Sequence, residues 1–186
     1  MKNQDITFNS LSKAPSEGTA SQHKFISQIN SIDLSTDHKI YSIFKATIIS
    51  VGKNPLYKSC GVNGCNKKVR DENNGMYHCD KCNVDSPTYG WRMILSLSVS
   101  DCTGQIWLTA FQENAEQLLG IKVDELSQYH EMNDTARFNE ILASICFKPI
   151  ILRVSTYVDT YNNERKLKTQ IYKSYKVDPV LRSRNL

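Results

Sequence analysis

Residues 91–111, "WRMILSLSVSDCTGQIWLTAF", carry the strongest structural signal in this 186-residue chain. Apolar residues and serines alternate along the first half, as Met93, Leu95, Leu97 and Val99 against Ser96, Ser98 and Ser100. A period of two predicts a half-buried strand. Asp101 to Gly104 is typical of a tight turn, and residues 105–111 continue as a second strand. The stretch therefore predicts a β-hairpin.

Further strands are predicted on both sides of this hairpin. Residues 40–51 are rich in β-branched and aromatic side chains and end at turn-forming residues. Residues 112–145 have helical character, with Gly120 closing the first helix and a break near Asn133 and Asp134. Residues 148–177 return to strand periodicity around a hairpin loop, "YNNERK". The predicted order is strand, insert, two strands, helices, two strands.

The N-terminal segment differs in composition from the rest. The first 20 or so residues are polar and read as a mobile lead-in, which suggests a piece of a longer chain. Phe25, Ile26, Ile29 and Ile32 recur at helical spacing and predict a short turn that docks on the domain. No secretory signal and no long apolar run is present, which points to the cytosol or nucleus. The net charge of +4 leans weakly toward an anionic partner.

Four of the six cysteines fall within 23 residues, as Cys60, Cys65, Cys79 and Cys82. Two short-spaced pairs can converge on one tetrahedral ion, and zinc is the expected occupant. A disulfide and an iron–sulfur cluster are the weaker alternatives. Four thiolates close the coordination shell, so the metal is expected to be structural. His78 is interpreted as a surface residue, and Cys102 and Cys146 as ordinary thiols.

Basic residues surround the cysteines, namely Lys53, Lys58, Lys67, Lys68 and Arg70. They could form a phosphate-facing patch or simply the solvated outside of a ribbon. Both interpretations are open from the residues alone.

Two groups of aromatic residues are candidates for base stacking. Ile106, Leu108 and Ala110 are small and aliphatic enough for a core, which places Trp107 and Phe111 on the outer face of the strand. Exposed rings there could stack bases, or helices or a partner could cover them. Tyr161 stands in a loop whose cations are Arg165, Lys166 and Lys168, and this loop fits a binding rim or a solvated tip. Arg92 and Arg153 are weaker candidates, predicted to point outward on neighbouring strands.

Four segments together resemble a known family. "CGVNGCNKKV", "GMYHCDKC", "WRMILSLSVSDCTGQIWLTAFQENAEQLLG" and "DTYNNERKLK", in this order and spacing, are closely similar to the third DNA-binding domain of the large subunit of replication protein A. The similarity spans about residues 24–180. It implies a mainly β protein, a five-stranded OB-fold barrel with a four-cysteine zinc ribbon inserted at 56–87 and helices between the third and fourth strands. It also implies a lead-in or linker over 1–38, the barrel domain over 39–180, and a short tail over 181–186.

The resemblance also assigns roles to residues. It implies that Phe111 and Tyr161 stack on bases, with Trp107 on the same face as Phe111. The expected phosphate contacts come from Arg92, Lys67, Lys68, Arg165, Lys166 and Lys168. The family's barrel is followed by a long helix that bundles with two smaller subunits, whereas here only "VDPVLRSRNL" follows.

The function implied is single-stranded DNA binding without catalysis, in a nuclear heterotrimeric complex that acts in DNA replication, repair and recombination. One alternative is a telomeric single-strand binding subunit of a telomerase holoenzyme, since the family includes such paralogues. Another is an assembly scaffold with little DNA binding. A zinc enzyme is disfavoured because neither a His-x-Glu motif nor paired carboxylates accompany the cysteines.

Overall fold

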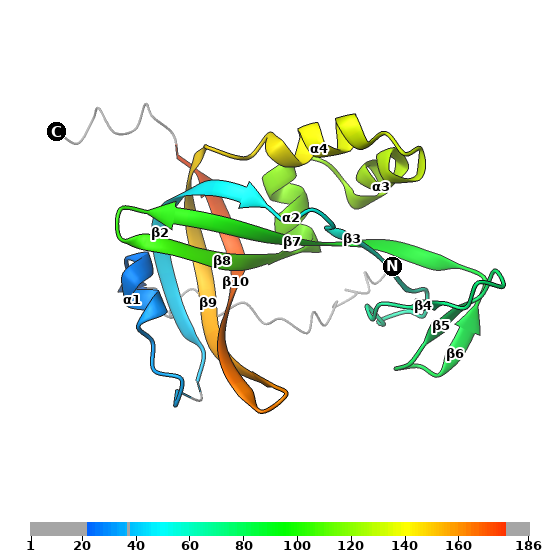
Figure 1. Ribbon diagram of the computed structural model, residues 1–186, viewed down its shortest axis with the longest axis horizontal. Helices are drawn as coiled ribbons and strands as arrows, with labels where there is room; N and C mark the ends of the chain where they lie inside the picture. The colour runs from blue at the N-terminus through cyan, green and yellow to red at the C-terminus, as the bar shows by residue number, and fades with distance from the viewer. Residues whose placement is uncertain (1–21, 37, 178–186) are drawn as a thin grey trace, which may run out of the picture.

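The computed structural model describes residues 22–36 and 38–177, and in it five long strands curl into a closed barrel (Figure 1). These strands are β2 (Ile40–Val51), β7 (Tyr89–Asp101), β8 (Gly104–Phe111), β9 (Pro149–Tyr161) and β10 (Glu164–Lys176). Their order is β2-β9-β10-β8-β7, and pairing of β2 with β7 closes the ring. The β10–β8 pair is parallel, and the other pairs in the ring are antiparallel. This closed ring is the predicted five-stranded OB barrel.

Alternating side chains fill the barrel, as the hairpin sequence predicts. Leu95, Leu97 and Val99 of β7 are fully buried, and Leu152 and Val154 of β9 meet them in the core. The predicted "YNNERK" loop is a two-residue turn in which Asn162 and Asn163 have φ of 50° and 62°. A turn with positive φ at both central positions matches the twist of the flanking strands, and asparagine tolerates it.

Three helices between β8 and β9 cover one end of the barrel. They are α2 (Gln112–Leu119), α3 (Val123–Glu131) and α4 (Thr135–Ala143). Gly120 ends α2 in the left-handed conformation, with φ of 72°. Asp134 begins α4 by accepting a hydrogen bond from the backbone N–H of Arg137. Both predicted boundaries are confirmed.

A short N-terminal segment packs on the barrel. β1 (Gln22–His23) pairs with β2, and α1 (Ile26–Asn30) follows, as the predicted helical turn. Ile26 and Ile29 are fully buried in the barrel core. The predicted lead-in over residues 1–38 therefore contains a packed element.

The cysteine-rich insert forms a separate small sheet beside the barrel, on the right in Figure 1. β3 (Leu56–Cys60) extends from the barrel and pairs with β7, whereas β4 (Arg70–Asp71), β5 (Tyr77–Cys79) and β6 (Val84–Ser86) form a three-stranded sheet. The β4–β5 turn has positive φ at Asn73 and Gly75. In the described part of the chain, no helix is long and apolar enough to span a membrane.

Candidate metal centre and nucleic-acid interface

The four predicted cysteine ligands converge in space. The Sγ atoms of Cys60, Cys65, Cys79 and Cys82 all lie within 4.8 Å of one another. The Cys65 and Cys79 sulfurs are 3.8 Å apart. Around a tetrahedral ion about 2.3 Å from each sulfur, neighbouring sulfurs are about 3.8 Å apart. The cluster therefore has the geometry to hold one metal ion.

Two tight turns bring these cysteines together. In the first, the N–H of Val62 donates to Cys60 Sγ (3.5 Å), the N–H of Cys65 donates to the carbonyl of Val62 (2.9 Å), and Gly64 takes a φ of 80°. In the second, the N–H of Asn83 donates to the carbonyl of Cys79 (2.8 Å). Donation from the backbone N–H of Cys82 is the main cause that lowers the pKa of the Cys79 thiol to about 7, whereas the hydrogen bond with Cys65 and burial raise the pKa of the Cys82 thiol. A lowered pKa favours the thiolate, which is the form that binds metals.

The other histidine and cysteine candidates stay outside this cluster. His78 Nδ1 lies 2.7 Å from an oxygen of Asp85, and His78 Nε2 lies 3.6 Å from Asp80. Cys102 is exposed in the β7–β8 turn, and Cys146 lies between α4 and β9. Neither belongs to the group of four sulfurs that could hold an ion.

The outer face of β8 carries two large exposed rings. Trp107 is 58% exposed and Phe111 is 48% exposed, whereas Leu108 and Ala110 between them are buried. The described helices do not cover these rings. Ser98 and Ser96 of β7 pair with Trp107 and Thr109, so small side chains flank the larger of the two rings. This is the aromatic face that alternation predicts.

Two of the basic residues near the ribbon form ion pairs, and three others are exposed. Lys58 packs its ammonium 4.5 Å from the ring centre of Tyr77 and lies 3.4 Å from a carboxylate oxygen of Asp71. Arg70 pairs with Glu72 (2.8 Å) and also with Asp80. Lys53, Lys67 and Lys68 are exposed. Lys58 thus packs against side chains of the ribbon, whereas Lys67 and Lys68 lie on the ribbon surface.

The β9–β10 hairpin presents its cations on two sides. Gln170 pairs with Thr109 of β8, so Lys168 and Lys166, at two-residue steps from it, lie on the outward side that Trp107 also occupies. Lys166 pairs with Glu164 (2.6 Å), and Lys168 pairs with Asp159. Exposed ion pairs of this kind are worth at most about 1 kcal/mol, so a phosphate can replace the carboxylate.

Arg165 alternates to the other side of the hairpin. A hydrogen bond from the backbone N–H of Ser35 lowers the pKa of Asp33, and the Arg165 charge adds a smaller contribution. The structure therefore does not bring Arg165 together with Lys166 and Lys168. Tyr161 ends β9 opposite Glu164, and its side chain lies outside the described part of the structure.

The two weaker arginine candidates, Arg92 and Arg153, lie apart in the structure. Arg92 Nη1 donates to Gln112 Oε1 (3.2 Å), beside Phe111. Arg153 lies on β9, and its guanidinium is 5.8 Å from the ring centre of Tyr175. The expectation that Arg92 and Arg153 occupy neighbouring strands is wrong, because β2 lies between β7 and β9. Sheet order cannot be deduced from alternation within single strands.

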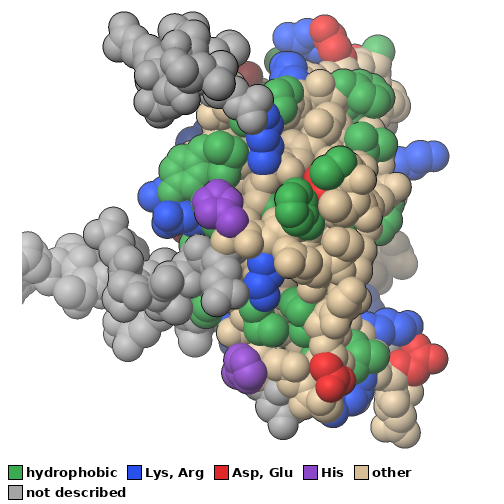
Figure 2. Space-filling model, turned by 90° about the vertical axis from the view of Figure 1, so that its left-hand side faces the viewer, with side chains coloured by type: hydrophobic (Ala, Val, Ile, Leu, Met, Phe, Trp, Pro, Cys, Tyr) green, Lys and Arg blue, Asp and Glu red, His purple; other side chains and the backbone are tan. Residues whose placement is uncertain are grey.

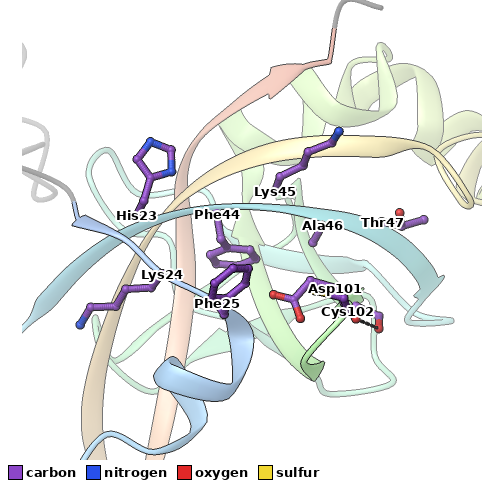
Figure 3. A pocket seen from close by; sticks show the side chains of 10 residues that line it. His23, Lys24, Phe25, Phe44, Lys45, Ala46, Thr47, Asp101 and Cys102 are labelled. Atoms are coloured by element: carbon purple, nitrogen blue, oxygen red, sulfur yellow. Dashed lines mark hydrogen bonds between the residues drawn. The ribbon is translucent and has the colours of Figure 1, made fainter. Parts of the chain in front are cut away.

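A shallow pocket of about 420 Å³ lies on the side of the barrel away from the ribbon. Figure 2 shows this side, where hydrophobic, basic and histidine side chains are interspersed. The pocket is lined by residues of β1, the link from β1 to α1, β2, the end of β7 and the β7–β8 turn, among them His23, Phe25, Lys45 and Cys102 (Figure 3). None of the predicted nucleic-acid contacts lines it, so it is distinct from the aromatic face of β8.

A closed barrel of this strand order, with a cysteine ribbon inserted between its first two strands and an exposed aromatic face, defines an OB-fold protein of the zinc-ribbon type. The model of the family "Replication factor-A C terminal domain" matches residues 41–186, and the chain belongs to this family.

Similar proteins support the assignment to this family. The chain is 35% identical over 138 residues to the mouse replication protein A 70 kDa DNA-binding subunit, covering 74% of this chain and 22% of that protein. It is 31% identical over 178 residues to replication factor A protein 1 of Saccharomyces cerevisiae, covering 90% of this chain and 28% of that protein. The chain thus spans about a quarter of the length of the curated relatives it matches.

Solved structures agree as well. A replication protein A heterotrimer bound to single-stranded DNA matches with a TM-score of 0.78 at 29% identity, covering 88% of this chain and 38% of that chain. Yeast replication protein A bound to single-stranded DNA matches with a TM-score of 0.73 at 28% identity, covering 89% of this chain and 93% of that chain.

Proposed function

We propose that this domain binds single-stranded DNA without catalysis, as part of a replication protein A-like complex. The observation that carries the proposal is the pair of exposed rings, Trp107 and Phe111, on the outward face of β8. Aromatic side chains on an OB barrel stack bases at about 1–3 kcal/mol per base, whatever the sequence. Exposed lysines occur on the ribbon, as Lys67 and Lys68, and on the outward side of the β9–β10 hairpin, as Lys166 and Lys168. In Figure 1 both of these elements project to the same side of β7–β8.

The proposed phosphate contacts are Lys67, Lys68, Arg92, Lys166 and Lys168. Arg165 is the least supported member of the predicted set, since it lies on the other side of its hairpin. Tyr161 stays a proposed stacking residue because its backbone ends β9 at the tip of the same hairpin. Neutralisation of phosphates makes the affinity fall with salt.

Zinc is the proposed occupant of the four-cysteine cluster. Thiolates at tetrahedral separation suit zinc, which would hold the two turns of the ribbon together. Native mass spectrometry is expected to show one zinc per chain, and protein without bound metal would contradict the assignment.

The proposed setting is the nucleus, with two smaller protein subunits as partners, acting in DNA replication, repair and recombination. The support is family membership, together with relatives that are DNA-binding subunits and a matching structure that is a heterotrimer. A telomeric role and a purely scaffolding role are the alternatives that a binding experiment separates.

The test is a fluorescence anisotropy titration with oligo-dT and with a G-rich telomeric repeat of equal length, at two salt concentrations. Phe111→Ala and Trp107→Ala are each expected to weaken binding by about fivefold to a hundredfold, the loss of one stacked base. Tyr161→Ala tests the third ring in the same way. Phe25→Ala is the matched control, since Phe25 is exposed to a similar degree but lines the pocket that is distinct from the aromatic face of β8.

Equal, salt-sensitive affinity for both oligonucleotides supports general single-strand binding. A marked preference for the G-rich repeat would favour the telomeric alternative. If neither oligonucleotide binds, the remaining alternative is a scaffold for protein assembly.

A further inference from the structure

The outward face of β8 continues toward the ribbon across a strip of three strands, β8, β7 and β3. Ile94 of β7 pairs with Phe111, and Arg92, two residues earlier on the same side of β7, pairs with Tyr57 of β3. Residues directly opposite one another in antiparallel strands share a face. The side of the sheet that carries Phe111 therefore also carries Arg92 and Tyr57.

The opposite side of this strip is already occupied. Trp91 of β7 pairs with Lys58 of β3, and their side chains contact the rings of Tyr89 and Tyr77 at the base of the ribbon. Trp91 Nε1 also donates to Glu131 of α3 (2.8 Å). Packing thus accounts for the side chains of this second side, and Tyr57 and Arg92 project from the other.

Tyr57 lies where the barrel meets the ribbon. Its ring is half-buried, and its hydroxyl donates to the carbonyl of Asn66 (3.2 Å), the residue before Lys67 and Lys68. Burial raises the pKa of Tyr57, and the nearby charge of Arg92 opposes this rise. The Tyr57 ring therefore lies near the charge of Arg92, and its hydroxyl is fixed to the ribbon by the hydrogen bond to Asn66.

Arg92 is held in place by side chains of α2. Gln112 Oε1 accepts its hydrogen bond (3.2 Å), and Gln112 Nε2 donates to Glu116 (3.3 Å). Glu116 in turn accepts from Lys122 (2.7 Å) and from the N–H of Val123 (3.1 Å) at the start of α3. A guanidinium carries five N–H donors, and the bond to Gln112 uses one of them. An oriented arginine beside an aromatic ring can bind a nucleotide, because the ring can stack on the base and the guanidinium can bind the phosphate.

We propose that Tyr57 and Arg92 form a further nucleotide subsite, in which Tyr57 stacks a base and Arg92 binds the adjoining phosphate. The subsite joins the aromatic face of β8 to Lys67 and Lys68 of the ribbon, so that one strand of DNA runs from barrel to ribbon. It rests on the proposed single-strand binding and deepens it by adding the next nucleotide along the path.

The test compares Tyr57→Leu with the unaltered chain on oligo-dT of graded length, from 4 to 16 nucleotides, about the range that single OB folds cover. The shortest oligonucleotides that bind can sit on Trp107 and Phe111 alone, so their affinity is expected to change by less than about twofold. Longer ones reach Tyr57, and their affinity is expected to fall by about fivefold to a hundredfold. Arg92→Ala is expected to weaken the same long oligonucleotides and to lower the salt slope by about 0.7, the value for one phosphate contact.

Tyr57→Phe is the matched control, because it keeps the ring and loses only the hydrogen bond to Asn66. It is expected to bind long oligonucleotides within about twofold of the unaltered chain, as a stacked ring requires. A loss as large as that of Tyr57→Leu would overturn the subsite, since Tyr57 would then act only by attaching the ribbon. Equal affinity of Tyr57→Leu and the unaltered chain at every length would also overturn it.

A measurement on the unaltered chain covers the case in which Tyr57→Leu loses its metal. Oligo-dT with 5-iodouracil at successive positions is cross-linked by light, and a peptide containing Tyr57 is expected among the adducts. Adducts at Trp107 or Phe111 without any at Tyr57 would refute the subsite while supporting the proposed function. If no oligonucleotide binds at all, the proposed function fails as well.

Discussion

Asp101 joins two segments that are 75 residues apart. Its Oδ1 accepts hydrogen bonds from the N–H of Thr103 (2.7 Å) and of Gly104 (3.1 Å), which shape the β7–β8 turn. Its Oδ2 accepts from the N–H of Ile26 (2.9 Å), the first residue of α1. Burial tends to raise the pKa of Asp101, but these hydrogen bonds outweigh it and the pKa lies below the usual range. One carboxylate thus fixes both the turn and the docking of α1.

Asp101→Asn is expected to lower the free energy of unfolding by about 1.5–3 kcal/mol, the range for hydrogen bonds to a charged group. Because folding lowers this pKa, the stabilisation is present above the unfolded value of about 4 and is lost as the pH falls further. The difference from the unaltered chain, measured by urea unfolding, should therefore shrink at acidic pH. Glu140→Gln removes a surface carboxylate paired with Arg137 (2.7 Å) and should cost less than about 1 kcal/mol. Equal effects of the two variants would contradict this role of Asp101.

Phe147 has an unusual backbone conformation for a bulky residue. Its φ is 60°, its side chain is 76% exposed, and its N–H donates to the carbonyl of Ile48 (2.7 Å). A left-handed conformation costs a residue with a Cβ about 1–2 kcal/mol. The exposed ring recovers little of that cost by burial.

Phe147→Gly is expected to raise the free energy of unfolding by up to about 1 kcal/mol, because relief of the strain exceeds the added entropy of the unfolded chain. Thermal unfolding measures the change. A clear loss of stability would mean that the ring makes favourable contacts in solution.

At the scale of elements, a row of rings connects the ribbon to the barrel and its helices. Ring centres are 4.6 Å apart for Tyr77 and Tyr89, 5.5 Å for Tyr89 and Trp91, and 5.5 Å for Trp91 and His130. The first two rings also pack against the cysteine cluster. Edge-on pairs of this kind add about 0.5–1.5 kcal/mol each to the burial of the rings. The ribbon is therefore seated on the barrel by packing, and its own fold depends on the cysteines.

Removal of the proposed zinc by a chelator is expected to unfold the ribbon and leave the barrel folded, because the two have separate cores. In a Trp107→Phe background, Trp91 is the single tryptophan and reports on the ribbon through its contact with Tyr89. Its emission should change on chelation, and amide exchange should quicken in residues 56–87 but not in β9 and β10. Unfolding of the whole domain in one transition would show that the ribbon supports the barrel.

At the scale of the whole molecule, the proposed binding of DNA predicts a different part for each cation according to its position relative to the aromatic face. Lys168 is on the outward side with Trp107, whereas Arg165 is on the other side of the same hairpin. Each single-strand phosphate contact contributes about 0.7 to the slope of log affinity against log salt.

Lys168→Gln is therefore expected to reduce the salt slope of oligo-dT binding by up to about 0.7, and Arg165→Gln is expected to leave it unchanged. Each variant removes one positive charge from β10, at positions three residues apart on opposite sides of the strand, so each is the control for the other. A reduction by Arg165→Gln as large as that by Lys168→Gln would mean that DNA wraps around the hairpin tip.

The sequence by itself determined the five barrel strands, the helical region between the third and fourth of them, and the four cysteines that cluster. Strand alternation, helix-ending glycine and paired cysteines are local signals, because each depends on the chemistry of residues close together in the chain. The outward direction of Trp107 and Phe111 follows from the same local period. These predictions therefore needed no knowledge of the tertiary structure.

Only the tertiary structure decided which of these residues meet. Closure of the barrel placed β2 between β7 and β9 and so separated Arg92 from Arg153, and alternation at the hairpin separated Arg165 from Lys168. Pairing of β3 with β7 brought Tyr57 beside Arg92, although 35 residues of sequence, including the cysteine ribbon, separate them. Such contacts depend on strand order and register, which are set by how the whole core closes and leave no mark on the local pattern.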